Sequence, residues 1–154
     1  MIFSEIKPFA RYVRYLNIES ALFFSPVIPV DARLFYVKSG IGRIRVADED
    51  FELSSGSAIY INAGVPYTYL VSEAKYLAVN FDFTMDCRDI HIPVPPVPLE
   101  KKDEFSPINK VTFSDMPRLD QYMFFSDARC IGSTLEAAEK EYAESEAKLE
   151  DLLK

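Results

Sequence analysis

Short apolar runs, broken by Gly, Pro and Asp, fill the first half of the chain. They are rich in Val, Ile, Phe and Tyr, which predicts strands at Arg33–Lys38, Arg43–Val46, Phe51–Leu53, Ser57–Ile61, Tyr67–Val71 and Tyr76–Phe83. The first two runs flank Ser39-Gly40-Ile41-Gly42, so we expect them to form a hairpin. Ser72-Glu73-Ala74 separates the last two. Strands this short, with a turn signal about every ten residues, favour an antiparallel sandwich or barrel.

The second half of the chain has a different pattern. An extended connector is expected over residues 91 to 107, because this stretch carries Pro93, Pro95, Pro96, Pro98 and Pro107. A first helix is expected over Met116–Phe125, with Asp115 as its N-cap. Ser133 opens a second helix, and Glu136 would complete a capping box. The pattern therefore predicts a C-terminal helical hairpin.

The second predicted helix carries an apolar stripe. Its members recur at alternating steps of three and four residues: Leu135, Ala138, Tyr142, Ser145, Leu149 and Leu152. Such a stripe suits a dimer interface, and it could also pack on the protein's own barrel. The helix reaches Lys154 in mid-pattern, so we expect the natural protein to continue beyond this residue.

The amino-acid composition and net charge of the chain exclude several classes of function. The chain has 154 residues, 49% hydrophobic and 27% charged, which is typical of one globular domain. Its 17 Lys and Arg against 24 Asp and Glu give a net charge of −7, which argues against direct nucleic-acid binding. The single histidine, His91, excludes metal sites that need two or three histidines. No run is long enough to span a membrane and no signal peptide is visible, so we expect a cytoplasmic protein.

Two glycines, Gly40 and Gly56, frame a recognisable pattern. The run LFYVKSGIGRIRVADEDFELSSGSAIYINAGVPYTYL resembles the conserved barrel of the cupin superfamily. More narrowly, it resembles the N-terminal effector-binding domain of AraC-type transcription regulators. In that family a Gly turn is followed by five residues and a Pro-x-Gly-x-x-His turn. This chain has Gly56, five residues and then Asn62–Tyr67. The resemblance spans roughly residues 20 to 154.

The resemblance implies a fold and a domain organisation. A mainly β, cupin-like barrel (a double-stranded β-helix, or jelly roll) with its proline-rich connector would occupy residues 1–107. Residues 108–154 would form two C-terminal helices, which dimerise the regulator in that family, through Leu135, Ala138, Tyr142, Leu149 and Leu152 here. The DNA-binding part, with two helix-turn-helix units, would follow Lys154.

The metal-binding positions of catalytic cupins are changed in this chain. Arg33 stands where the family has a Glu, Val27-Ile28-Pro29 lie where it has paired His residues, and Tyr67 replaces its third His. A cation and apolar side chains cannot hold a divalent metal, which needs deprotonated N, O or S donors. We therefore expect no metal, no cofactor and no enzymatic activity.

The same alignment implies a polar barrel lining. If Arg33 and Tyr67 face inward, strand alternation turns Tyr69 inward as well. On the last strand the resemblance places the family's aromatic on Phe81, which implies that Tyr76, Ala78 and Asn80 lie inside while Leu77, Val79, Phe81 and Phe83 face out. Phenols, an amide and a guanidinium suit a sugar or a small polar or acidic metabolite. Arg33 would favour a carboxylate or phosphate. Two plainer readings stay open: the tyrosines could serve strand packing alone, and Arg33 could lie outside, paired with Asp31 or Glu52.

The sequence thus predicts a small-molecule sensing and dimerisation domain of an AraC-type transcription regulator. Its partners would be a small effector, such as a carbohydrate or small acid, and a second copy of itself. DNA would be reached only through a domain outside this chain, and no membrane is involved. A free-standing ligand-binding cupin is the alternative. Less favoured is a metal-independent sugar-modifying cupin enzyme with Tyr67 or Tyr69 as its acid.

Overall fold

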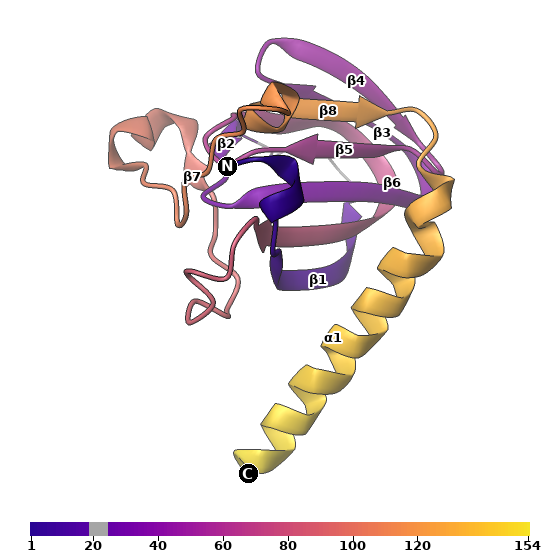
Figure 1. The fold of residues 1–154 in the computed structure, drawn as a ribbon. Helices are drawn as coiled ribbons and strands as arrows, with labels where there is room; N and C mark the ends of the chain where they lie inside the picture. Colours follow the sequence, from indigo (N-terminus) through magenta and orange to yellow (C-terminus); the bar gives the residue numbers. More distant parts are fainter. Residues whose placement is uncertain (19–24) are drawn as a thin grey trace.

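The computed structural model describes residues 1–18 and 25–154. The chain forms one antiparallel β structure from which a single long helix projects (Figure 1). Its strands are β1 (Phe9–Ile18), β2 (Val27–Ile28), β3 (Ala32–Val46), β4 (Glu49–Ser54), β5 (Ala58–Ile61), β6 (Tyr67–Asp82), β7 (Val97–Pro98) and β8 (Tyr122–Phe125). The helix α1 spans Gly132–Leu152, and short 3-10 turns lie at Phe3–Glu5, Leu99–Glu104, Pro117–Asp120 and Arg129–Ile131.

The long strands β3 and β6 organise the sheet. They pair along their whole length, from Ala32 opposite Phe81 to Val46 opposite Tyr67. One half of each strand belongs to the order β1-β6-β3-β5-β8, and the other half to β7-β2-β6-β3-β4. The two halves face each other across a common core, as in a jelly roll. The expected mainly antiparallel β fold is therefore confirmed.

The predicted hairpin at Ser39–Gly42 is wrong, because β3 continues through these residues and only bends there. The pairing with β6 shifts between Val37 and Ser39, and Gly40 has a φ of 83°. A Cβ on Gly40 would lie 2.1 Å from the carbonyl oxygen of Glu73 on β6. The glycine thus permits a close approach of two bent strands, not a reversal of the chain. Correspondingly, Ser72-Glu73-Ala74 does not divide β6.

The predicted C-terminal helical hairpin is also wrong, since only its second helix forms. Residues 117–120 make a 3-10 turn, and Tyr122–Phe125 forms β8, which pairs with β5. This pairing supplies the outer edge of β5 with backbone partners. Asp115 does not cap a helix; its carboxylate accepts the backbone N–H of Phe3.

Helix α1 begins one residue before the expected capping box. Its first residue is Gly132, no side chain caps it, and Glu136 instead pairs with Lys38 on β3. Three members of the stripe, Leu135, Ala138 and Tyr142, pack on an outer cluster of the barrel that contains Val13, Tyr36 and Leu77. Farther along, Leu149 and Leu152 are 52% and 83% exposed, where the helix projects away from the barrel (Figure 1). None of the helices in the described residues is long and apolar enough to cross a membrane.

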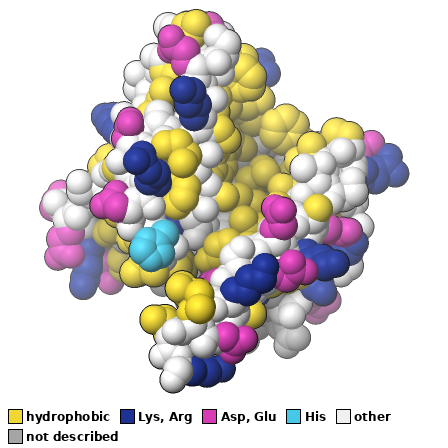
Figure 2. All heavy atoms as spheres, turned by 60° about the horizontal axis from the view of Figure 1, so that its bottom comes forward, with side chains coloured by type: hydrophobic (Ala, Val, Ile, Leu, Met, Phe, Trp, Pro, Cys, Tyr) yellow, Lys and Arg dark blue, Asp and Glu magenta, His cyan; other side chains and the backbone are white. Residues whose placement is uncertain are grey.

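Strand alternation separates an inner core from two outer clusters. Tyr67, Tyr76 and Ala78 of β6 join the inner core, together with Phe35, Val37, Ile44, Val46, Leu53, Ile59 and Ile61. Leu77 and Val79 face α1, whereas Phe81 and Phe83 pack with Tyr60 and Phe113. Viewed from the end at which α1 projects, apolar side chains also gather in a hollow of the surface (Figure 2).

Candidate functional site

The predicted site residues lie on the inner face of the barrel. Arg33 on β3 stands directly opposite Asn80 on β6, and their exposed fractions are 6% and 4%. Tyr67 and Tyr69 come from the other half of β6, across the interior, and Tyr76 lies near the bend. The bent strands therefore bring Arg33, Tyr67, Tyr69, Tyr76 and Asn80 to one interior, although they span almost fifty residues of sequence.

Aromatic rings form the wall of this interior. The ring centroid of Phe35 lies 5.7 Å from that of Tyr67, 5.9 Å from that of Tyr69 and 6.3 Å from that of Tyr76. The Tyr69 ring also lies 5.9 Å from Tyr67 and 5.8 Å from Tyr76. These edge-to-face and tilted contacts hold the phenols in fixed orientations. The interior thus has flat apolar walls that carry hydroxyl groups.

Burial keeps these phenols neutral. It raises the pKa of Tyr67, and the nearby Arg33 guanidinium opposes that rise. The pKa of Tyr69 is raised well above its ordinary value, also by burial in the first place and then by its neighbours Tyr67 and Tyr76. A neutral phenol both donates and accepts a hydrogen bond. At neutral pH these tyrosines therefore suit hydroxyl groups of a ligand.

One acceptor in the interior has no partner. Oδ1 of Asn80 is buried, and no donor among the described residues reaches it. An unsatisfied buried acceptor costs about 1–3 kcal/mol, so such atoms are rare in folded proteins. The position of Asn80 between Arg33 and the β1 residue Tyr12, its register partners on either side, aims this amide at the polar part of the interior. The amide thus keeps one unused hydrogen-bond acceptor inside the barrel.

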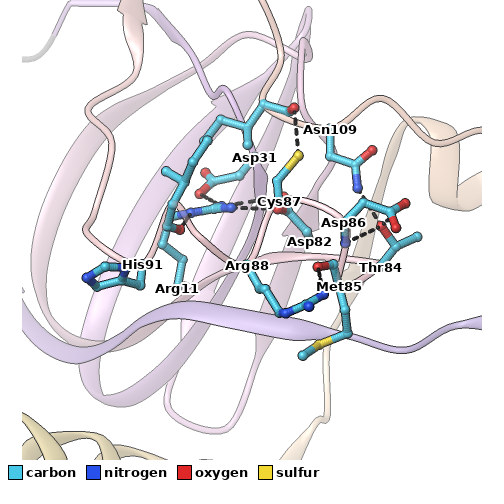
Figure 3. Close-up of polar contacts among 12 residues, drawn as sticks. Arg11, Asp31, Asp82, Thr84, Met85, Asp86, Cys87, Arg88, His91 and Asn109 are labelled. Carbon is cyan, nitrogen blue, oxygen red and sulfur yellow. Dashed lines mark hydrogen bonds and ion pairs between the residues drawn. The ribbon is translucent and has the colours of Figure 1, made fainter.

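A buried ion network closes one end of the barrel, and sequence reasoning missed its central member, Arg11. The side chain of Arg11 is fully buried and donates to Asp31 at 2.9 Å and to Asp82 at 2.5 Å (Figure 3). The other oxygen of Asp31 accepts from Nε of Arg33 at 2.8 Å. We call Arg11, Asp31, Arg33 and Asp82 the buried ion network. Two guanidiniums and two carboxylates sum to zero charge.

This network settles where Arg33 lies. Its side chain is inside the barrel and paired with Asp31, so the reading that placed it on the outer face is wrong, although the partner that reading named is correct. Arg33 is consequently not an uncompensated cation waiting for an acid. The only sequence signal for Arg11 is its charge within the apolar run FARYVRYLNI, which forms β1. In the structure, Arg11 lies where the β1–β6 register slips between Ala10 and Tyr12.

Residues 84–96, here called the strap, cross the same end of the barrel (Figure 3). Their backbone accepts from both buried arginines: Ile90 O from Arg11 at 2.6 Å and Val94 O from Arg33 at 3.1 Å. The Cys87 thiol donates to Ile108 O at 3.4 Å. Burial, with the carboxylates of Asp82 and Asp89, raises the pKa of this thiol, so it stays protonated and a poor nucleophile.

A separate surface pocket of about 530 Å³ lies between the turn at residues 62–66 and the segment 105–121. Phe105, Pro107 and Val65 line it together with Lys110 and Gln121. None of the predicted site residues lines this pocket, and the buried polar atoms described above do not open into it.

Comparison with known proteins finds distant likenesses to solved structures. No family model matches the chain, and no curated protein matches it. Among solved structures, one of the substrate binding mode and reaction-specificity switch of oxalate decarboxylase is 15% identical, covers 70% of this chain and has a TM-score of 0.43. A deletion mutant of the Bacillus subtilis enzyme is 15% identical over 70% of the chain, with a TM-score of 0.42. The chain spans 34% and 33% of those two proteins.

The prediction that this chain is not an enzyme is corrected by the same comparison. The solved structures named above are oxalate decarboxylases, which are enzymes, so the expected cupin-like fold gives no ground for excluding catalysis. Identities of 15–16% and TM-scores of 0.40–0.43 carry nothing further about the activity of this chain.

One of those solved structures concerns the Mn(II) centres of the Bacillus subtilis enzyme, which calls for a test of the donors in this barrel. The described interior offers two guanidiniums, neutral phenols and an amide, and its carboxylates Asp31 and Asp82 are already paired with Arg11 and Arg33. No group of three or more His, Cys, Asp or Glu side chains suited to a metal occurs among the described residues. This donor set does not fit a divalent metal ion.

Proposed function

We propose that the barrel interior binds a small, uncharged polyhydroxy molecule such as a sugar. The observation that carries this proposal is the unpartnered Oδ1 of Asn80, buried among phenol groups and beside Arg33. A ligand hydroxyl would donate to this oxygen and relieve the cost of leaving it unsatisfied. The aromatic rings of Phe35, Tyr67 and Tyr69 would pack on the apolar faces of the ligand.

The absence of net charge in the buried ion network favours a neutral ligand. Arg33 and Arg11 are matched by Asp31 and Asp82, so an added carboxylate would be an unpaired buried charge. Burying such a charge without a partner is costly. A neutral sugar is therefore expected to bind more tightly than the corresponding sugar acid.

Titration calorimetry with a panel of neutral sugars and polyols, each paired with its sugar acid, tests this proposal. We expect saturable binding of a neutral member. Asn80→Leu should weaken that binding about tenfold or more, because the ligand donor then faces an apolar group. Asn17→Leu is the matched control, since Asn17 is exposed on β1. Failure of every neutral member, or equal losses in both variants, would overturn the proposal.

The same mixtures are analysed for reaction products, because a cupin interior can also house catalysis. Conversion of a bound sugar that is lost in Tyr67→Phe or Tyr69→Phe would replace simple binding by the enzyme alternative. Recovery of the sugar unchanged would support binding as the function of the interior.

We further propose that the chain is the cytoplasmic effector-binding and dimerisation part of an AraC-type transcription regulator, whose DNA-binding part lies outside these residues. The support is the sequence resemblance together with the exposed leucines at the end of α1. Leu135, Ala138 and Tyr142 are engaged with the chain's own barrel, so the dimer interface is proposed at Leu149 and Leu152. Sedimentation equilibrium should show a dimer that Leu149→Glu with Leu152→Glu dissociates. Lys148→Glu, on the same turn, is the control that should not.

A further inference from the structure

The surface pocket beside the turn at residues 62–66 lies between two segments that the rest of the fold holds in place. The backbone N–H of Asn62 donates to Gln121 O at 2.8 Å, which ties the turn to the segment that leads into β8. That segment is fixed in turn by Nδ2 of Asn109, which donates to Oγ1 of Thr84 at 2.6 Å (Figure 3). The pocket is therefore a built feature of the fold, and its volume of about 530 Å³ is typical of small-molecule sites.

The described lining of this pocket holds one cation, Lys110, and one anion, Asp120. Within the part of the chain that the structure describes, neither forms an ion pair, with the other or with any third side chain. Oδ1 of Asp120 accepts the backbone N–H of Phe113 at 2.9 Å, which orients the carboxylate and leaves its second oxygen without a described partner. Lys110 is exposed, and its long side chain can reach across the pocket mouth. Two unpaired opposite charges at one pocket suit a ligand that carries both charges.

Apolar side chains make up much of the remaining lining. Val65 is buried, while Phe105 and Pro107 are half-buried and keep part of their surface open to the pocket. The Phe105 ring lies against the turn, since a Cβ on Gly64 would meet it at 3.6 Å. A bare ion or a fully polar molecule would leave this apolar surface in contact with water, whereas an apolar group on the ligand would cover it. The lining thus favours a ligand with an apolar body.

We propose that this pocket binds a zwitterionic amino acid with a large apolar side chain. The ammonium group donates to Oδ2 of Asp120, the carboxylate pairs with Lys110, and the apolar side chain packs against Phe105. Both polar contacts are charge-assisted hydrogen bonds, and a ligand that lacks either charge loses one of them. The site is separate from the barrel interior, because none of the residues proposed to bind a ligand there lines this pocket. It therefore does not depend on the proposed function of the interior.

Titration calorimetry of the full chain with phenylalanine tests the proposal. Two analogues keep the ring and lose one charge: 3-phenylpropionate has no ammonium group, and phenethylamine has no carboxylate. Phenylalanine should bind about tenfold or more tightly than either analogue. Asp120→Asn removes the negative charge but keeps an oxygen for the Phe113 N–H, so the fold should be retained. Both Asp120→Asn and Lys110→Gln should weaken phenylalanine binding about fivefold or more.

Lys102→Gln and Asp103→Asn are the matched controls, because both residues are exposed nearby in the chain and lie outside the pocket lining. They should leave phenylalanine binding unchanged. In amide NMR spectra, phenylalanine should shift the signals of residues 62–66 and 105–121 and spare those of residues 76–80 in β6. The proposal would be overturned by a lack of saturable binding, by equal affinity for the two analogues, by equal losses in the controls, or by shifts at residues 76–80 in place of the pocket.

Discussion

Arg33 stands directly opposite Asn80 across strands β3 and β6, and both side chains face the inner core of the barrel. One of the two is fully committed to a protein partner, because Asp31 accepts from Arg33 at 2.8 Å. The other keeps an acceptor without a partner among the described residues. The asymmetry of this pair gives the interior its chemistry: the charge of Arg33 is compensated, and the neutral amide of Asn80 has an unused acceptor.

Replacing Asn80 by leucine should stabilise the free protein. The substitution removes an unsatisfied acceptor, which costs about 1–3 kcal/mol where it is buried, and adds an apolar side chain of similar size. We expect the free energy of unfolding in urea to rise by about 1 kcal/mol. Asn17→Leu on the exposed face of β1 should show no such gain, and a loss of stability in Asn80→Leu would mean that the amide already has a structural role.

Removing Arg11 should be among the most damaging single changes. Its fully buried guanidinium holds both Asp31 and Asp82, so Arg11→Met leaves the buried Asp82 without its arginine partner and Asp31 with Arg33 alone. Breaking a buried pair in this way costs about 3–5 kcal/mol. Urea unfolding of Arg11→Met measures the loss. Arg45→Met, which breaks the exposed pair with Asp50, is the control and should leave stability unchanged. Equal stability of the two variants would contradict the account of the network.

Sequence reasoning was most accurate in predicting which face of the sheet each side chain of β6 occupies. The predicted division of β6, with Tyr76 and Ala78 inside and Leu77 and Val79 outside, agrees with the packing clusters. A period of two is a strong signal when one face is buried. The family resemblance, and not the period of two alone, predicted Arg33, Tyr67 and Asn80 in the interior, and their role in ligand binding stays a prediction.

The errors have separate physical causes. Gly40 gives the same signal for a hairpin as for a close crossing of strands, and only the pairing with β6 distinguishes the two. Tyr122–Phe125 forms a strand because it pairs with the outer edge of β5, about sixty residues earlier in the chain. Such a long-range contact is not visible in the local sequence pattern. Arg11 was missed because its acid partners lie 20 and 71 residues away in sequence.

The close approach at Gly40 predicts a larger cost for its replacement than at a comparable glycine. Both Gly40 and Gly64 have positive φ, of 83° and 88°, so alanine strains the backbone at each. At Gly40 the added Cβ would also lie 2.1 Å from the Glu73 carbonyl oxygen, whereas at Gly64 it would meet only the Phe105 ring at 3.6 Å. Thermal unfolding should show Gly40→Ala to be the less stable variant. The reverse order would contradict the strand crossing.

Alkaline pH should unfold the protein through its buried phenols. Burial raises the pKa of Tyr69 and of Tyr60 above the ordinary value of 10.0. The unfolded chain therefore loses these protons first, so their contribution to stability is complete below pH 10 and is lost as the pH rises toward the folded-state pKa. The free energy of unfolding, followed by phenolate absorbance, should fall above pH 10. Tyr69→Phe should flatten that fall, and an unchanged slope would place Tyr69 in a solvated setting.

The central claim is that a neutral polyhydroxy ligand satisfies Asn80. The most direct measurement is a crystal structure of the protein with the tightest-binding neutral sugar of the panel. The account predicts density inside the barrel with a ligand hydroxyl about 3 Å from Oδ1 of Asn80, and with the Arg33–Asp31 pair intact. A ligand seated elsewhere, such as in the surface pocket beside Phe105, or an Asn80 that still lacks a donor, would contradict it.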